Sequence, residues 1–216
     1  MEKIEYENKE ICAECGGFCC KKCGCDYSVD DFDDLSVDAI QKLLEEGHVS
    51  IVSFQNFKEI NGKMTCSPYL YLRERNINRP AVDLLSMKTR CSSLTDTGCM
   101  YSLENRPSGG VNLIPQKGKP CYPEKNPFDI VKGFERYQKS LARVVKRMTG
   151  KSVDAQLRED VYKLFCDIRL GHFEGVMKME IEDILGMLPM LVQAFPDEFE
   201  RSRKVGNVLS MTKKSN

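Results

Sequence analysis

Apolar residues recur at helical spacing throughout the C-terminal part of the chain. The first stripe advances in alternating steps of four and three residues, and its members are Ile130, Phe134, Tyr137, Leu141, Val144 and Met148. A second stripe runs from Val153 to Ile168, and a third runs from Val176 to Leu191. Pro189 lies within the third stripe and is expected to kink or split that helix. The pattern predicts a helical bundle over residues 127–205.

A β-hairpin is predicted in the first half of the chain. Two segments rich in apolar residues, His48 to Ile60 and Lys63 to Arg73, flank the pair Asn61 and Gly62. Asn-Gly is the preferred residue pair of a two-residue type I′ turn, so the two segments are expected to pair as antiparallel strands. Pro68 places the second strand at an edge or makes it short, because proline has no N–H to donate to a neighbouring strand.

A short helix is predicted before the hairpin. Ser36 is a suitable N-cap, and Gly47 is a suitable stop. The segment from Cys12 to Cys25 is too rich in glycine and cysteine to form a regular element. The predicted fold class is therefore α+β, with an irregular cysteine-rich lobe that is organised by metal, contains a small hairpin and precedes the helical bundle.

Prolines mark the expected boundary between the two parts. The stretch from Pro115 to Pro127 contains four prolines and a glycine, which disfavour both a regular helix and a central strand. We therefore expect a cysteine-cluster metal-binding domain over residues 1–126 and a helical domain over residues 127–205. The polar and basic residues 206–216 are expected to form a flexible tail.

Composition and charge exclude several classes of protein. The 216 residues are 41% hydrophobic and 30% charged, which suits a folded chain with a sizeable core. Lysine and arginine number 32, as do aspartate and glutamate, so the net charge points to no polyanionic partner. The basic positions between Phe128 and Gly150 are interpreted as a solvated helix face, and nucleic-acid binding is not expected.

The compartment is predicted from the N-terminus and from the apolar segments. The first ten residues contain no basic region followed by an apolar one, unlike a secretory signal. The longest apolar stretch, Ile184 to Phe195, is shorter than the roughly 20 residues that span a bilayer. A cytoplasmic protein without membrane contact is therefore expected.

The eleven cysteines carry most of the functional signal, and ten of them lie before residue 122. In a reducing compartment, crowded cysteines favour thiolate ligands or redox chemistry over structural disulfides. Cys12 with Cys15, and Cys20 with Cys23, have the Cys-x-x-Cys spacing that brings two sulfurs together. Zinc and iron–sulfur clusters both accept four thiolates, so spacing does not select between them. The order of cysteines differs from those of radical enzymes that use adenosylmethionine and of bacterial ferredoxins.

The order of cysteines resembles that of a known family. The run Cys12, Cys15, Cys19, Cys20 is similar to the signature of the CxxCxxxCC family, also called YkgJ-like zinc- or iron-chelating proteins. That family then has a cysteine, a Gly-Cys pair, an aromatic residue and an Arg-Pro pair, matched here by Cys91, Gly98, Cys99, Tyr101, Arg106 and Pro107. The family's next cysteine is expected near Gly110, so here Cys121 or Cys66 takes its place or the site differs. The resemblance covers residues 10–122.

The resemblance and the spacing together predict a metal site formed by thiolates. The strongest ligand candidates are Cys12, Cys15, Cys19, Cys20, Cys91 and Cys99. The second rank contains Cys23, Cys25, Cys66 and Cys121. The leading prediction is a cysteine-cluster protein that holds zinc or an iron–sulfur cluster.

Two alternative functions remain open at this stage. Some relatives resemble iron–sulfur proteins that modify lysine side chains, which implies an iron–sulfur enzyme acting on a protein or peptide substrate. The surplus of thiols also fits a protein that delivers or senses metal. The sequence assigns no catalytic residue and does not decide whether the protein is an enzyme.

Overall fold

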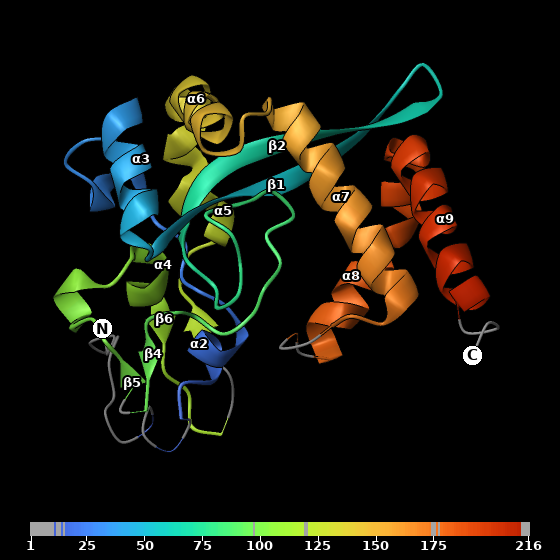
Figure 1. The fold of residues 1–216 in the computed structure, drawn as a ribbon. Coiled ribbons are helices and arrows are strands. Elements are labelled where there is room, and N and C mark those ends of the chain that lie inside the picture. The colour runs from blue at the N-terminus through green and yellow to red at the C-terminus, as the bar shows by residue number, and fades with distance from the viewer. Residues whose placement is uncertain are drawn as a thin grey trace.

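A long β-hairpin is the central element of the fold (Figure 1). The computed structural model describes residues 11, 14, 16–96, 98–118, 121–173, 176 and 178–212. Strand β1 (Val49–Ile60) pairs antiparallel with β2 (Lys63–Glu74), and the register runs from Val49 opposite Glu74 to Ile60 opposite Lys63. β1 also pairs in parallel with the short strand β3 (Val82–Asp83), which gives the strand order β2-β1-β3.

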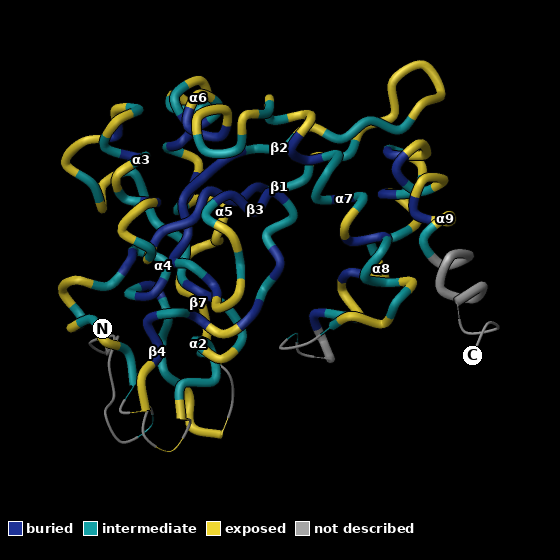
Figure 2. Tube along the Cα trace, in the orientation of Figure 1, coloured by how far each residue is buried: buried dark blue, intermediate teal, exposed yellow. Residues whose placement is uncertain are grey.

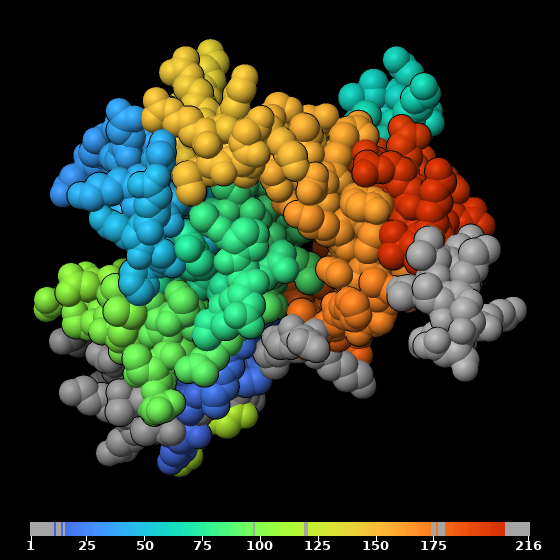
Figure 3. Space-filling view, viewed as in Figure 1, coloured from blue at the N-terminus to red at the C-terminus, as the bar shows by residue number. Residues whose placement is uncertain are grey.

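The hairpin turn and the edge position of β2 confirm the sequence prediction. Asn61 and Gly62 have φ angles of 51° and 73°, the positive values that a type I′ turn requires. Pro68 of β2 lies opposite Gln55 of β1. Because β2 is an edge strand of the sheet, the missing N–H of Pro68 costs no hydrogen bond to a further strand. The tip of the hairpin is exposed and projects from the molecule, whereas the base of the hairpin is buried (Figures 2 and 3).

The predicted short helix is also present. Helix α3 (Val37–Glu46) begins after Ser36, whose side chain accepts a hydrogen bond from the N–H of Ala39. It ends at Gly47, which has a φ angle of 101° and so adopts the left-handed conformation that favours glycine. Ile40 and Leu44 of this helix are buried.

The first predicted C-terminal helix is divided into three pieces. Helix α5 (Pro127–Val131) leads into the 3-10 helix η3 (Lys132–Tyr137), which leads into α6 (Gln138–Thr149). Contacts with β2 explain the division, because the hydroxyl of Tyr69 donates to the carbonyls of Val131 and Lys132, at 3.2 and 2.8 Å. The Gln138 side chain also bonds both backbone groups of Leu70 on the edge of β2. Tertiary hydrogen bonds thus replace a regular helical ladder here.

Three long helices follow, and they are α7 (Val153–Leu170), α8 (Lys178–Ala194) and α9 (Pro196–Thr212). Of these, α7 and α8 match the second and third predicted stripes, and α9 matches no predicted stripe. The side chain of Ser152 caps α7 by accepting from the N–H of Ala155. Pro189 lies inside α8 and does not split it. Helix α9 continues to Thr212 and so includes part of the segment expected to form a tail.

The buried core contains residues from both sides of the expected boundary at residue 126. Ile51, Tyr71 and Leu72 of the hairpin belong to the same buried cluster as Phe134 and Leu141 of the C-terminal part. Helices α6 and α8 both contact β2. The protein is therefore a mixed α and β fold in which the C-terminal helices pack on the sheet.

The smaller elements lie mostly at the lower left of Figure 1, and seven of the nine described cysteines lie in or near them. They are α2 (Phe18–Lys22), η1 (Val29–Asp31), β4 (Leu94–Thr95), β5 (Gly98–Cys99), η2 (Leu103–Asn105), α4 (Ser108–Val111), β6 (Leu113–Ile114) and β7 (Tyr122–Pro123). Among the described residues, no helix has the length and apolar character needed to cross a membrane.

Candidate metal centre

Six cysteines, two of them from α2, line one pocket with a volume of about 110 Å³. They are Cys19, Cys20, Cys25, Cys91, Cys99 and Cys121. We call this site the cysteine pocket. None of the nine described cysteines is in a disulfide. The fold therefore brings thiols from residues 19 to 121 to a common surface.

Helix α2 presents Cys19 and Cys20 to the cysteine pocket. The helix follows Gly17, which has a φ angle of 74° and itself lines the pocket. A Cβ atom at position 17 would lie 2.9 Å from a methyl group of Leu94, so glycine is required for both conformation and space. The two adjacent cysteines share the pocket, although an extended segment would have turned them to opposite faces.

Cys25 is placed by an extended segment that pairs with the end of β2. The N–H of Glu74 donates to the carbonyl of Cys25 at 2.8 Å, and the N–H of Tyr27 donates to Leu72 at 3.0 Å. Gly24 allows this close approach, because a Cβ atom there would lie 2.0 Å from the carbonyl oxygen of Glu74. The segment thus continues the sheet beyond β2 and turns Cys25 toward the cysteine pocket.

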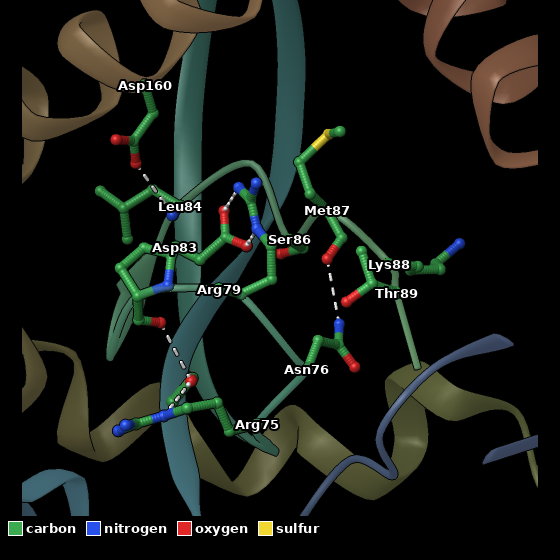
Figure 4. Close-up of polar contacts among 12 residues, drawn as sticks. Arg75, Asn76, Arg79, Asp83, Leu84, Ser86, Met87, Lys88, Thr89 and Asp160 are labelled. Carbon is green, nitrogen blue, oxygen red and sulfur yellow. Dashed lines mark hydrogen bonds and ion pairs between the residues drawn. The ribbon is translucent and has the colours of Figure 1, made fainter. Parts of the chain in front are cut away.

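Cys91 follows a long irregular connection that side-chain bonds hold in place (Figure 4). Arg79 and Asp83 face one another in this connection and form two hydrogen bonds, of 2.7 and 3.0 Å. Asp160 reaches the connection from α7 and accepts from the N–H of Leu84 at 3.1 Å. Cys91 itself donates its N–H to the carbonyl of Cys20 at 2.7 Å, which joins two pocket segments directly.

Asn76 ties the start of this connection to the segment after α2. Its Oδ1 atom accepts from the N–H of Gly24 at 2.7 Å, and its Nδ2 atom donates to the carbonyl of Met87 at 3.0 Å. Asn76 also forms a β-bridge with Cys91. One buried amide therefore connects three segments that carry or flank the cysteines.

Two small strand pairs supply the last two cysteines. Cys99 lies on β5, opposite Leu94 of β4. Cys121 precedes β7, which pairs with β6. The buried side chain of Asn112 fixes this second pair by bonding both backbone groups of Lys125, at 3.0 and 2.8 Å. Both cysteines therefore sit on short segments that depend on tertiary contacts.

The thiols of the pocket influence one another electrostatically. A hydrogen bond from the Cys20 thiol, together with one from Cys121, lowers the pKa of Cys19 to about 6, against the opposing effect of burial. The same bond to Cys19 raises the pKa of Cys20. Burial, and then the nearby charge of Cys91, raises the pKa of Cys25, and burial raises the pKa of Cys91 to about 12. The hydrogen-bonded pair of Cys19 and Cys20 thus favours a single thiolate.

Glu74 forms part of the same pocket wall and is 1% exposed. Its carboxylate accepts hydrogen bonds from the hydroxyl groups of Tyr27 and Ser93, and from that of Tyr101 at 3.4 Å. It is the only carboxylate among the described residues that line the cysteine pocket. Burial and the charge of Glu74 raise the pKa of Tyr27 and of Tyr101, so both remain hydrogen-bond donors.

The predicted ligands do not all meet in the cysteine pocket. Cys12 and Cys15 lie outside the described residues. Cys23 lines a neighbouring pocket, where Nδ2 of Asn76 lies 4.0 Å from its sulfur. Cys66 lies on β2 opposite Phe57 and lines neither pocket. Four of the six strongest candidates and two of the second rank thus line the cysteine pocket.

The described thiols line the pocket without forming a coordination shell. No group of three or more His, Cys, Asp or Glu residues in the described part of the chain is placed to hold a metal ion. The donor set itself, several sulfurs around a cavity, suits zinc or an iron–sulfur cluster.

The downstream residues of the family resemblance also meet in the cysteine pocket. Gly98, Cys99, Tyr101, Arg106 and Pro107 all line it. Asn76 and Glu74 were not singled out by the sequence, because a lone Asn or Glu at a strand end carries no motif.

Comparisons with protein-family models, with curated proteins and with solved structures found no match to this chain.

Proposed function

We propose that this protein binds a metal, as zinc or as an iron–sulfur cluster, through thiolates of the cysteine pocket. The observation that supports this proposal is the gathering of six cysteines from residues 19 to 121 around one cavity, none of them in a disulfide. Structural disulfides would place sulfurs in pairs, whereas metal sites need several thiols around one point. When bound, the metal would supply the positive charge that stabilises buried thiolates.

The candidate ligands within the pocket are Cys19, Cys20, Cys25, Cys91, Cys99 and Cys121. Cys25 has additional support from its position beside Gly110, because the next cysteine of the resembling family is expected near that residue. A Cβ atom at position 110 would lie 2.9 Å from the sulfur of Cys25. The sulfur of Cys25 therefore lies close to where the sulfur of a cysteine at position 110 would lie. Cys121 lines the same pocket.

The residues around the ligands have supporting roles in this proposal. The hydroxyl groups of Tyr27, Ser93 and Tyr101 donate to Glu74 and hold its carboxylate on the pocket wall. A carboxylate held in this way would act on the ligands through its negative charge and so tune the site. Asn76 holds the segments of Cys23 and Cys91 together.

The proposal is tested by metal analysis of protein purified without oxygen. About one or two zinc atoms per chain without absorption near 400 nm would indicate a zinc site, since zinc is colourless. Roughly four irons with matching sulfide and a broad band near 400 nm would indicate an iron–sulfur cluster. Iron with sulfide would also favour the alternative of an enzyme that modifies a protein side chain. Absence of both metals at stoichiometric amounts would refute the proposal.

Matched cysteine variants connect the metal to the pocket. Cys91→Ser is expected to lose most of the bound metal, because it removes a buried thiol of the pocket. Cys66→Ser is the control, since Cys66 lies on β2 outside the pocket. Equal metal content in the two variants would show that the metal is held elsewhere.

A further inference from the structure

A second pocket, with a volume of about 460 Å³, adjoins the cysteine pocket. It shares Cys19, Cys25, Leu113 and Cys121 with the cysteine pocket, and we call it the lateral pocket. Sites for small organic molecules are typically about 300–1,000 Å³. The lateral pocket is therefore large enough for a small organic ligand.

Apolar side chains form one side of the lateral pocket. Phe54, Leu113 and Ile130 line it together with Pro123 and Pro127. The ring of Phe54 is stacked on the buried ring of Tyr71, with centroids 4.7 Å apart, so this wall is fixed by the core. Each of these surfaces would be covered by the apolar body of a ligand.

Cations outnumber carboxylates on the rest of the wall. Lys22, Arg73 and Lys88 line the lateral pocket, and Asp26 is the only carboxylate among its described lining residues. Asp26 is already paired with Arg73, at 2.7 Å. Lys22 and Lys88 are therefore the cations of this wall whose charge Asp26 does not offset.

The two lysines differ in their partners. Nζ of Lys88 lies 3.6 Å from Glu180, which does not line the lateral pocket. Lys22 forms no ion pair with any of the described residues. Lys22 is therefore the cation best placed to attract an anionic group into the pocket.

We infer that the lateral pocket binds a small organic anion. Its apolar body lies against Phe54 and Ile130, and its acidic group faces Lys22 and Lys88. This inference rests on the cavity, its apolar wall and its charge, and it does not depend on a bound metal. A ligand held there would also lie beside Cys19, Cys25 and Cys121.

The test is a fluorescence titration of the purified full chain with 1-anilinonaphthalene-8-sulfonate, an aromatic anion. Saturable binding to one site is expected, and Lys22→Met should raise the dissociation constant about tenfold by removing the cation while keeping an apolar stem. Lys21→Met is the matched control, because Lys21 is exposed and does not line the pocket. It should leave the affinity unchanged.

A neutral probe separates charge from apolar contact. N-phenyl-1-naphthylamine, which lacks the sulfonate, should bind more weakly, and Lys22→Met should leave that binding unchanged. Ile130→Trp, which fills the apolar side, should weaken both probes while circular dichroism verifies that the variant is folded. Equal effects of Lys22→Met and Lys21→Met, or no saturable binding of the anion, would overturn the inference.

Discussion

Gly24 makes the tightest backbone approach near the cysteine pocket, and Gly24→Ala tests whether that approach holds the site together. A Cβ atom at this position would lie 2.0 Å from the carbonyl oxygen of Glu74, far inside the 3.0 Å that real Cβ contacts respect. The two segments would have to separate by about 1 Å. That movement would stretch the backbone bonds that join residues 25–27 to β2.

The magnitude follows from the contacts that would be lost. Three hydrogen bonds are affected: Glu74 to Cys25 at 2.8 Å, Tyr27 to Leu72 at 3.0 Å, and Gly24 to Asn76 at 2.7 Å. At about 1 kcal/mol each, with a similar cost for overpacking, Gly24→Ala should lower the free energy of unfolding by about 4 kcal/mol. The displaced Cys25 should also reduce the metal bound per chain.

The assay is urea denaturation followed by circular dichroism, with metal analysis of the same samples. Gly186→Ala is the matched control. Gly186 is exposed within α8, and a Cβ atom added there meets nothing within 4 Å. This control should be neutral or more stable by up to about 1 kcal/mol, because alanine favours helix over glycine. A Gly24→Ala protein within about 0.5 kcal/mol of wild type, with full metal content, would refute the reasoning.

Three further predictions concern the rest of the fold. Burial raises the pKa of Asp160 from 3.8 to about 6. The free energy of unfolding should therefore fall by at most about 3 kcal/mol as the pH rises from about 4 to 6. Asp160→Asn should reduce this pH dependence, as measured by urea denaturation at several pH values. Phe134→Ala should cost about 3–5 kcal/mol in denaturation experiments, because Phe134 is fully buried, and a cost below about 1 kcal/mol would contradict its place in the core. Asp83→Asn should cost about 3 kcal/mol by leaving Arg79 without its carboxylate, and an unchanged melting temperature would show that this pair contributes nothing.

Local signals in the sequence determined the elements whose geometry depends on one or two residues. Asn61 and Gly62 adopt positive φ angles and form the hairpin turn, because few other residues tolerate that conformation. Helix α3 begins after Ser36 because its side chain accepts a hydrogen bond from a free N–H of the first turn. It ends at Gly47 because glycine readily adopts the left-handed conformation. The apolar stripes likewise predicted the helical C-terminal part, since their spacing matches a helix.

Cysteine spacing in the sequence indicated a shared site but could not select its members. Cys25 and Cys121 line the cysteine pocket with Cys19 and Cys91, whereas Cys66 does not. The selection depends on which strand each cysteine occupies and on backbone pairing between segments far apart in the chain. Glu74 lines the pocket because it is the last residue of β2, and β2 ends at the pocket wall.

Tertiary contacts also determined where the predicted helix over residues 127–149 is interrupted. Residues 127–149 carry one continuous helical stripe, yet the hydroxyl of Tyr69 and the amide of Gln138 divide them into three elements. The C-terminal helices share a buried cluster with the hairpin, because their apolar faces pack on the sheet. Sequence periodicity specifies which face of a helix is apolar, whereas the surface that covers this face is set only when the whole chain folds.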